Sequence, residues 1–301
     1  MSDDTPLTRF EPALKLGRLT NETPALKRFQ ETFVQSLTRP WVRNAVHRRL
    51  YVDGVDWLVD HQPTRGLLLV SNHRSFFDQY MAALCLAEAG VTWAKNRYFP
   101  VRANFFYDKP AGVLINLLIG GGAMYPPIFR ERSKADLNRD AVDRLVGFLQ
   151  DPSTLVGMHP EGQRNKGDDP YALLRAQPGV GEVILRAQPM VVPLFIGGLG
   201  NDFLNEARLN YRENVRRTAP IILCFGQPLD YSQFLDKPPR MTLYKRCADH
   251  ALDAVRALGE RERELRARCL SGEIGNDDPN WLTRRIRRRR SRARRGELVG
   301  V

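Results

Sequence analysis

The segment 67–80 reads LLLVSNHRSFFDQY and combines an apolar run, a polar turn and the start of a helix. The apolar residues of 67–70 are typical of a strand that is covered on both faces. Ser71 and Asn72 are turn and capping residues, and a helix is expected over 79–89. A strand that passes through a short turn into a helix indicates an α/β protein.

The rest of the chain repeats this alternation. Further buried strands are expected at 155–158, 191–196 and 221–225, and further helices at 136–150, 180–188 and 241–270. The predicted fold class is therefore α/β, with a mixed, largely parallel sheet flanked by helices.

An amphipathic helix is predicted before this region. Residues 1–22 are polar and expected to be loose, and Thr23 with Pro24 form a helix start. Pro40 is expected to kink or break the helix. Large apolar residues recur every three or four positions among basic ones, so this helix packs on the core or lies on an anionic membrane. These apolar residues are Leu26, Phe29, Phe33, Leu37 and Trp41.

The domain boundaries follow from composition. The segment 1–50 is read as the polar segment and amphipathic helix, 51–270 as the main domain, and 271–301 as a linker followed by an arginine-rich tail. The tail carries nine arginines over 284–295 and supplies most of the net charge of +12.

Composition excludes several classes of protein. The chain has 301 residues, 43% of them hydrophobic and 27% charged, which excludes a fully disordered chain or a collagen-like repeat. No apolar run approaches the ~20 residues of a membrane span, and the N-terminus is acidic and polar, so neither a transmembrane helix nor a signal peptide is expected. The four cysteines match no zinc spacing and are expected as reduced thiols in the cytoplasm.

Three segments carry candidate chemistry. His73 and Asp78 could meet only if His73 lies in the turn and leans back over the helix start, where a carboxylate would orient it as a general base. The alternative is a capping turn with a structural aspartate. The segment 125–134, YPPIFRERSK, offers arginines for a phosphate, or is a solvated turn. In 156–166, VGMHPEGQRNK, a tight turn at Gly162 brings backbone N–H groups and Arg164 near a ligand, with His159 packed beside it.

The order of these segments resembles the glycerolipid acyltransferase family, whose type members act on lysophosphatidic acid and glycerol-3-phosphate. The family motif N-H-x4-D corresponds to 72–78, I-F-I-D-R to 128–132, F-P-E-G-T-R-S to 159–165, and a Val-Pro strand to 192–193. Ala94 and Lys95 resemble an alanine–lysine pair common between the first two motifs. The resemblance covers about residues 51–230. Glu131, Arg130, Gln163 and Asn165 depart from the pattern.

The resemblance implies an O-acyltransferase of phospholipid biosynthesis. His73 would be the base and Asp78 its partner; Lys95, Arg132 and Arg164 would bind the acceptor phosphate, with Glu161 and Gly162 ordering the pocket. The donor would be acyl-CoA or acyl-carrier protein as co-substrate, with no other cofactor and no metal. The acceptor would be 1-acylglycerol-3-phosphate, with glycerol-3-phosphate or another lyso-lipid as alternatives. Cys85, two helical turns beyond Asp78, is a rival nucleophile but is expected in the core.

The arginine tail raises a different function class, a nucleic-acid or other polyanion-binding protein without catalysis. The tail lacks interleaved aromatic residues, and no nucleic-acid motif accompanies it. Nucleic acid is therefore not the expected partner. An anionic membrane surface is, because clustered cations near such a surface contribute about 1 kcal/mol each. The expected location is peripheral, on the cytoplasmic face of a membrane.

Overall fold

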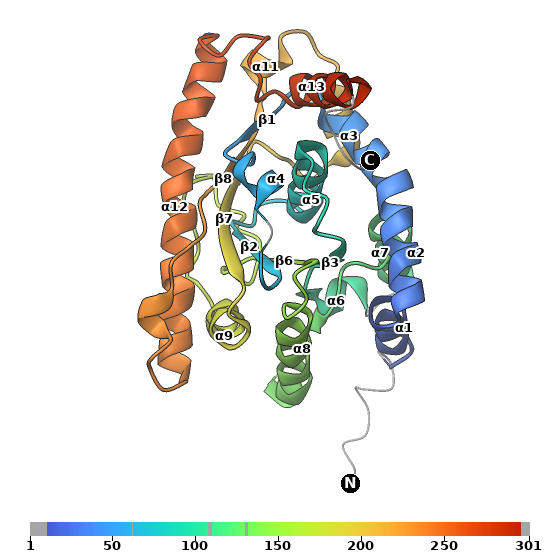
Figure 1. The fold of residues 1–301 in the computed structure, drawn as a ribbon, viewed down its shortest axis with the longest axis vertical. Coiled ribbons are helices and arrows are strands. Elements are labelled where there is room, and N and C mark those ends of the chain that lie inside the picture. The colour runs from blue at the N-terminus through green and yellow to red at the C-terminus, as the bar shows by residue number, and fades with distance from the viewer. Residues whose placement is uncertain (1–10, 62, 108–109, 130–131, 296–301) are drawn as a thin grey trace.

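The computed structural model describes residues 11–61, 63–107, 110–129 and 132–295. The six-stranded sheet has the order β1-β8-β7-β2-β6-β3 and lies between two helical layers (Figure 1). Its strands are β1 (Leu50–Asp53), β2 (Leu67–Ser71), β3 (Asn96–Tyr98), β6 (Thr154–Met158), β7 (Met190–Gly197) and β8 (Ile221–Phe225). Neighbouring strands are parallel except β7 and β8, which are antiparallel. The predicted α/β class with a mixed, largely parallel sheet is confirmed.

Alternate residues of β2 enter two different cores, which explains its unbroken apolar sequence. Leu68 and Val70 pack in the core beneath α8 (Ala135–Phe148), α9 (Pro178–Ala187) and α12 (Met241–Ser271). Leu67 and Leu69 pack on the opposite face with α3 (Arg39–Val46) and α5 (Asp78–Ala89). A central strand buried on both faces needs no polar alternation.

Shorter elements complete the described chain. They are α4 (Trp57–Asp60), β4 (Val101–Arg102), α6 (Ala103–Phe106), α7 (Pro110–Gly120), β5 (Pro127–Ile128), the 3-10 turn η2 (Arg132–Lys134), α10 (Phe203–Leu209), α11 (Val215–Thr218) and the 3-10 turn η3 (Ser232–Phe234). β4 and β5 pair in a separate two-stranded sheet.

The N-terminal segment is more helical than predicted. Residues 11–22, expected to be loose, form α1 (Glu11–Glu22). The predicted helix start at Thr23 and Pro24 is confirmed by α2 (Pro24–Phe33). The helix is not broken by Pro40: a π-helical turn, η1 (Val34–Thr38), leads into α3, whose first turn accommodates the proline.

Helix α2 buries its polar side and exposes apolar side chains. Lys27, Gln30 and Glu31 are buried, and Glu31 forms an ion pair with the buried Arg97 of β3. Phe29 is 71% exposed. The apolar stripe of the sequence therefore does not pack on the protein's own core, because a satisfied polar cluster occupies that interface.

The predicted linker and tail differ from the expectation. Trp281, inside the expected linker, is completely buried and bridges to Tyr51 at β1. It leads into α13 (Leu282–Arg294), so most of the arginine run is a helix packed against α5 and β1. Residues 1–10 and 296–301 of the predicted end segments lie outside the described residues. The proposed boundaries at 50/51 and 270/271 stay predictions.

Two glycines of α9 should respond in opposite ways to alanine. A Cβ at Gly181 would lie 1.9 Å from the Tyr244 carbonyl oxygen on α12, whereas one at Gly179 meets nothing within 4 Å. We expect Gly181→Ala to lower the free energy of unfolding by about 1–3 kcal/mol through overpacking. Gly179→Ala should raise it by about 0.5 kcal/mol through helix propensity. Urea unfolding measures both, and equal effects would contradict close α9–α12 contact.

Candidate active site

The turn after β2 is fixed to the neighbouring strand β7. Asn72 donates from Nδ2 to the Ile196 carbonyl oxygen (2.9 Å) and accepts from the Ile196 N–H at Oδ1 (2.8 Å). Its side chain is buried, so both bonds are shielded from water. These contacts hold the segment 72–77 at the carboxyl end of the parallel strands, where α/β proteins bind ligands.

His73 and Asp78 meet in this turn. The Nδ1 atom of His73 lies 3.0 Å from Oδ2 of Asp78, whose side chain is 1% exposed. The same carboxylate oxygen accepts the backbone N–H groups of Arg74 and Ser75, each at 2.9 Å. The predicted geometry, with His73 in the turn leaning back over the helix start, is therefore confirmed. It leaves Nε2 of His73 as the proton acceptor.

The protonation states suit a base and its partner. Burial, followed by the positive charge of Arg164, lowers the pKa of His73 to about 4. Burial raises the pKa of Asp78 to about 6, although hydrogen bonds from Ser75 and Arg74 oppose the rise. At neutral pH His73 is thus uncharged and can accept a proton, while Asp78 is an anion that can stabilise the resulting imidazolium.

The segment 159–165 holds the backbone of His73 from both sides. Glu161 accepts the His73 N–H at Oε1 (2.9 Å) and the Leu174 N–H at Oε2 (2.8 Å). Asn165 donates its N–H to the His73 carbonyl oxygen (2.8 Å). The carboxylate of Glu161 therefore orders the pocket through backbone groups. The positioning contact of Asn165 was not predicted, because nothing in the sequence identifies which turn reaches His73.

His159 stacks face to face on His73. The ring centroids are 3.9 Å apart and the planes differ by 6°. Its Nδ1 lies 3.1 Å from the Ser71 carbonyl oxygen and its Nε2 lies 2.9 Å from the Gln79 amide nitrogen. These partners fit a neutral ring that donates from Nδ1 and accepts at Nε2, consistent with a pKa that burial lowers to about 3.

The three residues His73, Asp78 and His159 have ligand atoms within 4.8 Å of one another. A metal ion needs lone pairs that converge on one point. Stacked imidazoles direct their in-plane lone pairs side by side, and Nδ1 of His73 already bonds Asp78. The cluster fits proton transfer better than metal binding.

Arg164 reaches the mouth of the site. Its guanidinium lies 3.6 Å from the ring centroid of Phe76 and donates to Asn201 Oδ1 (2.8 Å). Asn201 Oδ1 also accepts the Phe76 N–H (3.1 Å). Arg164 thus lies close enough to His73 to influence its pKa, as the predicted anion-binding role requires. Asn201 follows β7 at the same edge of the sheet, a position that could have marked it from the predicted strands alone.

Gly162 forms the predicted tight turn. Its φ of +65° lies in the left-handed region that favours glycine, and its N–H bonds the His159 carbonyl oxygen at 3.0 Å. A Cβ here would also lie 2.9 Å from Gln177 Cγ. The turn therefore specifies glycine and sets the direction in which the chain continues to Arg164.

Lys95 does not join His73. It is exposed and precedes β3, where its N–H bonds the Ser153 carbonyl oxygen. β3 is parallel to β6 with Asn96 opposite Thr154, so Lys95 lies at the amino end of the strands. His73 lies beyond Val70 at the carboxyl end, at least five residue steps, or about 17 Å, further along at 3.3 Å per residue. The phosphate-binding role of Lys95 stays a prediction, and this structure does not place Lys95 beside His73, because the motif order does not reveal at which end of the strands a residue lies.

Arg132 and Cys85 are the remaining residues that the sequence singles out, and neither is seen beside His73 in the described structure. The backbone of Arg132 begins η2 before α8, but its side chain and residues 130–131 lie outside the described residues. Cys85 is 1% exposed, and burial raises the pKa of its thiol well above the ordinary value. It is unsuited to act as a nucleophile, and all four cysteines are free and buried, as expected for core thiols.

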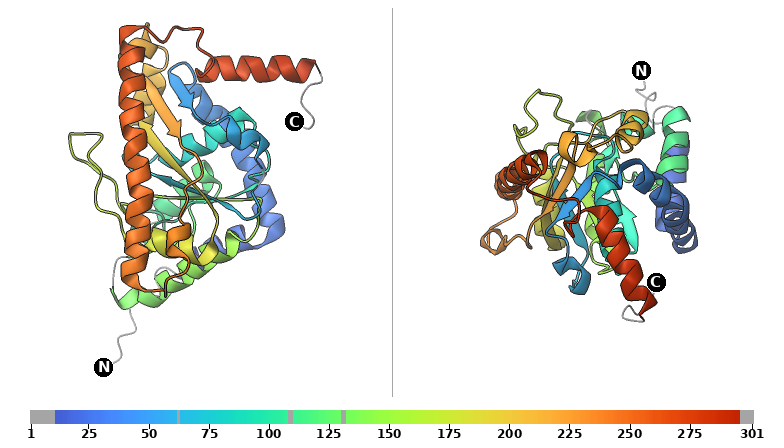
Figure 2. Two further views of the ribbon diagram at one scale, coloured as in Figure 1. Left: turned by 60° about the vertical axis from the view of Figure 1, so that its left-hand side comes forward. Right: turned by 90° about the horizontal axis from the view of Figure 1, so that it is seen from above.

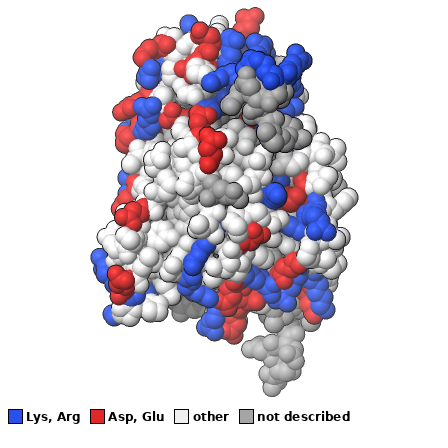
Figure 3. Space-filling view, in the orientation of Figure 1, with Lys and Arg blue, Asp and Glu red and all other residues white. Residues whose placement is uncertain are grey.

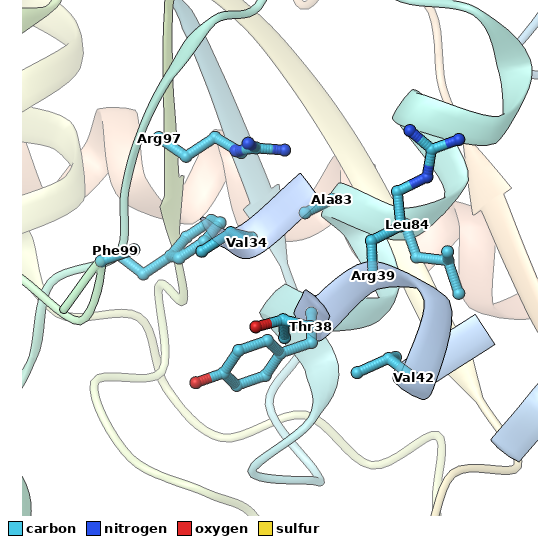
Figure 4. A pocket seen from close by; sticks show the side chains of 10 residues that line it. Val34, Thr38, Arg39, Val42, Ala83, Leu84, Arg97 and Phe99 are labelled. Carbon is cyan, nitrogen blue, oxygen red and sulfur yellow. The ribbon is translucent and has the colours of Figure 1, made fainter. Parts of the chain in front are cut away.

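Two cavities lie away from His73. One, of about 30 Å³, lies between the π turn, α3, α5 and β3 and is lined by Thr38, Ala83 and Phe99 among others (Figure 4). It has the volume of one water molecule and cannot hold an acyl chain. A second, of about 460 Å³, lies between α1, the segment 125–129 and α8. Its arginines, Arg18 and Arg144, are already paired with Asp140.

The low pKa of His73 predicts an unusual pH profile. The active form needs a neutral His73 and an ionised Asp78, so kcat/KM should first fall near pH 6, where Asp78 takes up a proton. The His73 ring itself should take up a proton only near pH 4, well below the ordinary histidine pKa of 6.5. Removing the charge of Arg164 with Arg164→Gln should raise the pKa of His73, measured by NMR titration of the ring. Arg263→Gln on α12 is the control, and a His73 ring that titrates near pH 6.5 in the wild-type protein would contradict the burial argument.

Replacing His159, whose ring stacks on His73, should lower kcat. His159→Phe keeps an aromatic face on His73 but leaves the Gln79 amide and the Ser71 carbonyl without their partner. We expect about a tenfold fall in kcat with little change in KM, because a small misplacement of the base slows proton transfer. Steady-state kinetics measures this. A larger change in KM than in kcat would instead indicate that His159 contacts substrate.

The comparisons with known proteins agree with this geometry. Residues 55–197 match the protein-family model described as Acyltransferase. The match includes His73, Asp78 and the turn at 159–165, and it ends with β7. No curated protein is similar enough to count as a match. The part of the chain that carries the His73–Asp78 pair, residues 55–197, is thus identified as an acyltransferase-family domain.

Proposed function

We propose that the protein transfers a fatty acyl group from acyl-CoA or acyl-carrier protein to the free hydroxyl of 1-acylglycerol-3-phosphate. The observation that carries the proposal is the pair of His73 with the buried Asp78, with Nε2 of the neutral ring left to accept a proton. A lipid hydroxyl is a poor nucleophile at neutral pH and needs such a base.

The reaction is a direct transfer in this proposal. His73 Nε2 takes the proton as the acceptor oxygen attacks the thioester carbonyl, and Asp78 stabilises the imidazolium at Nδ1. The carbon–sulfur bond then breaks, the thiolate leaves, and His73 returns the proton to it. Arg164 would hold the acceptor phosphate so that the hydroxyl lies at His73. No step uses Cys85.

An apolar surface leads to this site. Leu37 is 60% exposed, and Trp41 stacks on Phe203 with centroids 3.9 Å apart. Phe203 in turn lies 5.5 Å from Phe77, in the turn that carries His73. Exposed apolar side chains in a continuous strip mark an interaction surface. The strip supports a lipid acceptor over the soluble glycerol-3-phosphate.

The strip broadens along the N-terminal helices. α7 packs beside η1 (Figure 1). Its Leu114 and Ile115 are exposed, as is Phe29 of α2. Within the described ranges no helix is both long enough and apolar enough to cross a bilayer. We therefore assign the exposed face of α2, η1, α3 and α7 to contact with the membrane that supplies the acceptor.

The test is thiol release from acyl-CoA by wild type and His73→Ala, with and without 1-acylglycerol-3-phosphate. We expect release that needs the acceptor and disappears in the variant. His250→Ala, which changes a surface histidine at α12, is the matched control. Acceptor-independent release would identify a thioesterase. Release with glycerol-3-phosphate alone would reassign the acceptor, and absence of release with every acyl-CoA, acyl-carrier-protein and lyso-lipid pair would overturn the proposal.

A further inference from the structure

Helix α13 is a fixed part of the structure and presents arginines in a defined direction. Leu282 is fully buried at its start, and Arg285 forms an ion pair with Asp56. One turn later, Arg289 donates to the Ala87 carbonyl oxygen at the end of α5 (2.6 Å). These contacts dock one side of α13 on the body while the helix extends along one end of the molecule (Figure 2).

The opposite side of α13 carries exposed cations. Arg287, Arg290 and Arg294 are spaced by three and four residues, which places them on one face, and Arg288 lies next to it. Within the described ranges the only ion pair of α13 is that of Arg285. Lys and Arg side chains gather at this end of the surface (Figure 3).

Neighbouring elements add to the charge. Arg216 of α11 bonds Thr283 and the Arg48 carbonyl oxygen. Burial lowers the pKa of Arg216, and the charges of Arg284, Arg48 and Arg287 lower it further. Guanidinium groups this close repel one another, and an anionic partner would relieve that repulsion. The cluster therefore points to a polyanionic surface.

The position of α13 selects among polyanions. The end of α5 contacts α13 through Ala87 and α3 through Glu88, which pairs with both Arg39 and Arg43. Helices α13 and α3 therefore both contact the same end of α5, and α3 carries Trp41 of the apolar strip. Cations beside exposed aromatic and aliphatic residues fit a lipid surface, because the apolar groups enter the hydrocarbon boundary while the cations meet phosphates. A nucleic acid would leave the aliphatic residues in water.

We infer that α13 is an electrostatic docking helix that binds the phosphates of anionic phospholipids and presses the apolar strip against the bilayer. The inference rests on the proposed function at one point, which is that an acceptor located in a membrane requires the protein to bind that membrane. It assigns the arginines to docking, separate from the chemistry at His73. Arg287, Arg290 and Arg294 lie on the exposed face of a helix whose docked face contacts the far end of α5 from Asp78.

The test is flotation of the full chain with vesicles of phosphatidylcholine alone and with 30% phosphatidylglycerol. The variant is Arg287→Gln, Arg290→Gln, Arg294→Gln. The matched control is Arg256→Gln, Arg263→Gln, Arg268→Gln, which removes the same charge from α12 on the other side of the sheet. At about 1 kcal/mol per cation, the α13 variant should bind anionic vesicles roughly 100-fold more weakly. The control should bind within about threefold of wild type, and Arg→Lys at the three α13 positions should retain binding.

Several outcomes would overturn the inference. Equal losses in both triple variants would show generic charge attraction, and unchanged binding would show that α13 does not dock. Tighter binding to duplex DNA than to anionic vesicles at the same salt concentration, lost in the α13 variant, would reassign the helix to nucleic acid. Thiol release from a short-chain, water-soluble acyl-CoA and acceptor is measured without vesicles. Normal release by the α13 variant assigns its loss to membrane docking, whereas absence of release by the wild type indicates a failure of the proposed function.

Discussion

Replacing His73 by alanine should lower acceptor-dependent thiol release by about 10³-fold, because general-base catalysis contributes about 10²–10⁴-fold. The KM for the acyl thioester should change little, since the ring acts on the acceptor hydroxyl. Asp78→Asn should cost about 10²-fold. The asparagine keeps the shape of the side chain but removes the negative charge that stabilises the imidazolium. It also weakens the three hydrogen bonds that the carboxylate oxygen accepts.

The two substitutions should not be additive. Asp78 acts through His73, so the double variant His73→Ala, Asp78→Asn should be no slower than His73→Ala alone. Steady-state kinetics of the four proteins completes the cycle, with His250→Ala as the control for the preparation. A double variant that multiplies the two losses would show that Asp78 contributes independently of His73. A His73→Ala variant with more than a tenth of wild-type activity would show that His73 is not the base.

The catalytic turn could be predicted because its geometry is local. A strand, a five-residue separation and a helix start determine where His73 and Asp78 lie, and only one arrangement brings them together. The strands at 155–158, 191–196 and 221–225 were predictable for a similar reason, since a continuous apolar run identifies a buried strand.

Long-range placement could not be predicted in the same way. Lys95 lies one helix after the catalytic turn in the sequence, yet the direction of β3 places it at the amino end of the strands, whereas His73 lies at the carboxyl end. The stack of His159 on His73 joins two segments more than 80 residues apart and depends on the register of β2 with β6. A pattern along one chain does not specify such a register.

The orientation of amphipathic helices was the other limit. Periodicity in 26–41 predicts an apolar stripe but not its direction, and in α2 the polar side is the buried one. Lys27 shows why this is possible. Its ammonium bonds Gln30 and the Arg97 carbonyl oxygen, so the buried cation is satisfied. Similarly, the arginine-rich sequence of α13 predicts an exposed tail and does not reveal the contacts that hold the helix on the body, chiefly the ion pair between Arg285 and Asp56.

Glu161→Gln should reduce kcat by about 10²-fold and lower the free energy of unfolding by about 1.5–3 kcal/mol. The carboxylate is 2% exposed and accepts one backbone N–H with each oxygen. A glutamine amide presents an NH₂ group to one of these donors, so one buried N–H loses its partner and a hydrogen bond to a charged group is lost. If the affected N–H is that of His73, the turn moves and the base is misplaced.

Activity and urea unfolding should be measured together, with Glu182→Gln on the surface of α9 as the control. Glu161 is a positioning residue in this argument, so kcat should fall while the KM for the acceptor changes less than threefold. A large rise in that KM with normal kcat would show that Glu161 contacts the acceptor. Unchanged stability would contradict the two buried hydrogen bonds. Because Asn165 holds the carbonyl oxygen of His73, Glu161→Gln should leave the fold intact and loosen only one side of the catalytic turn.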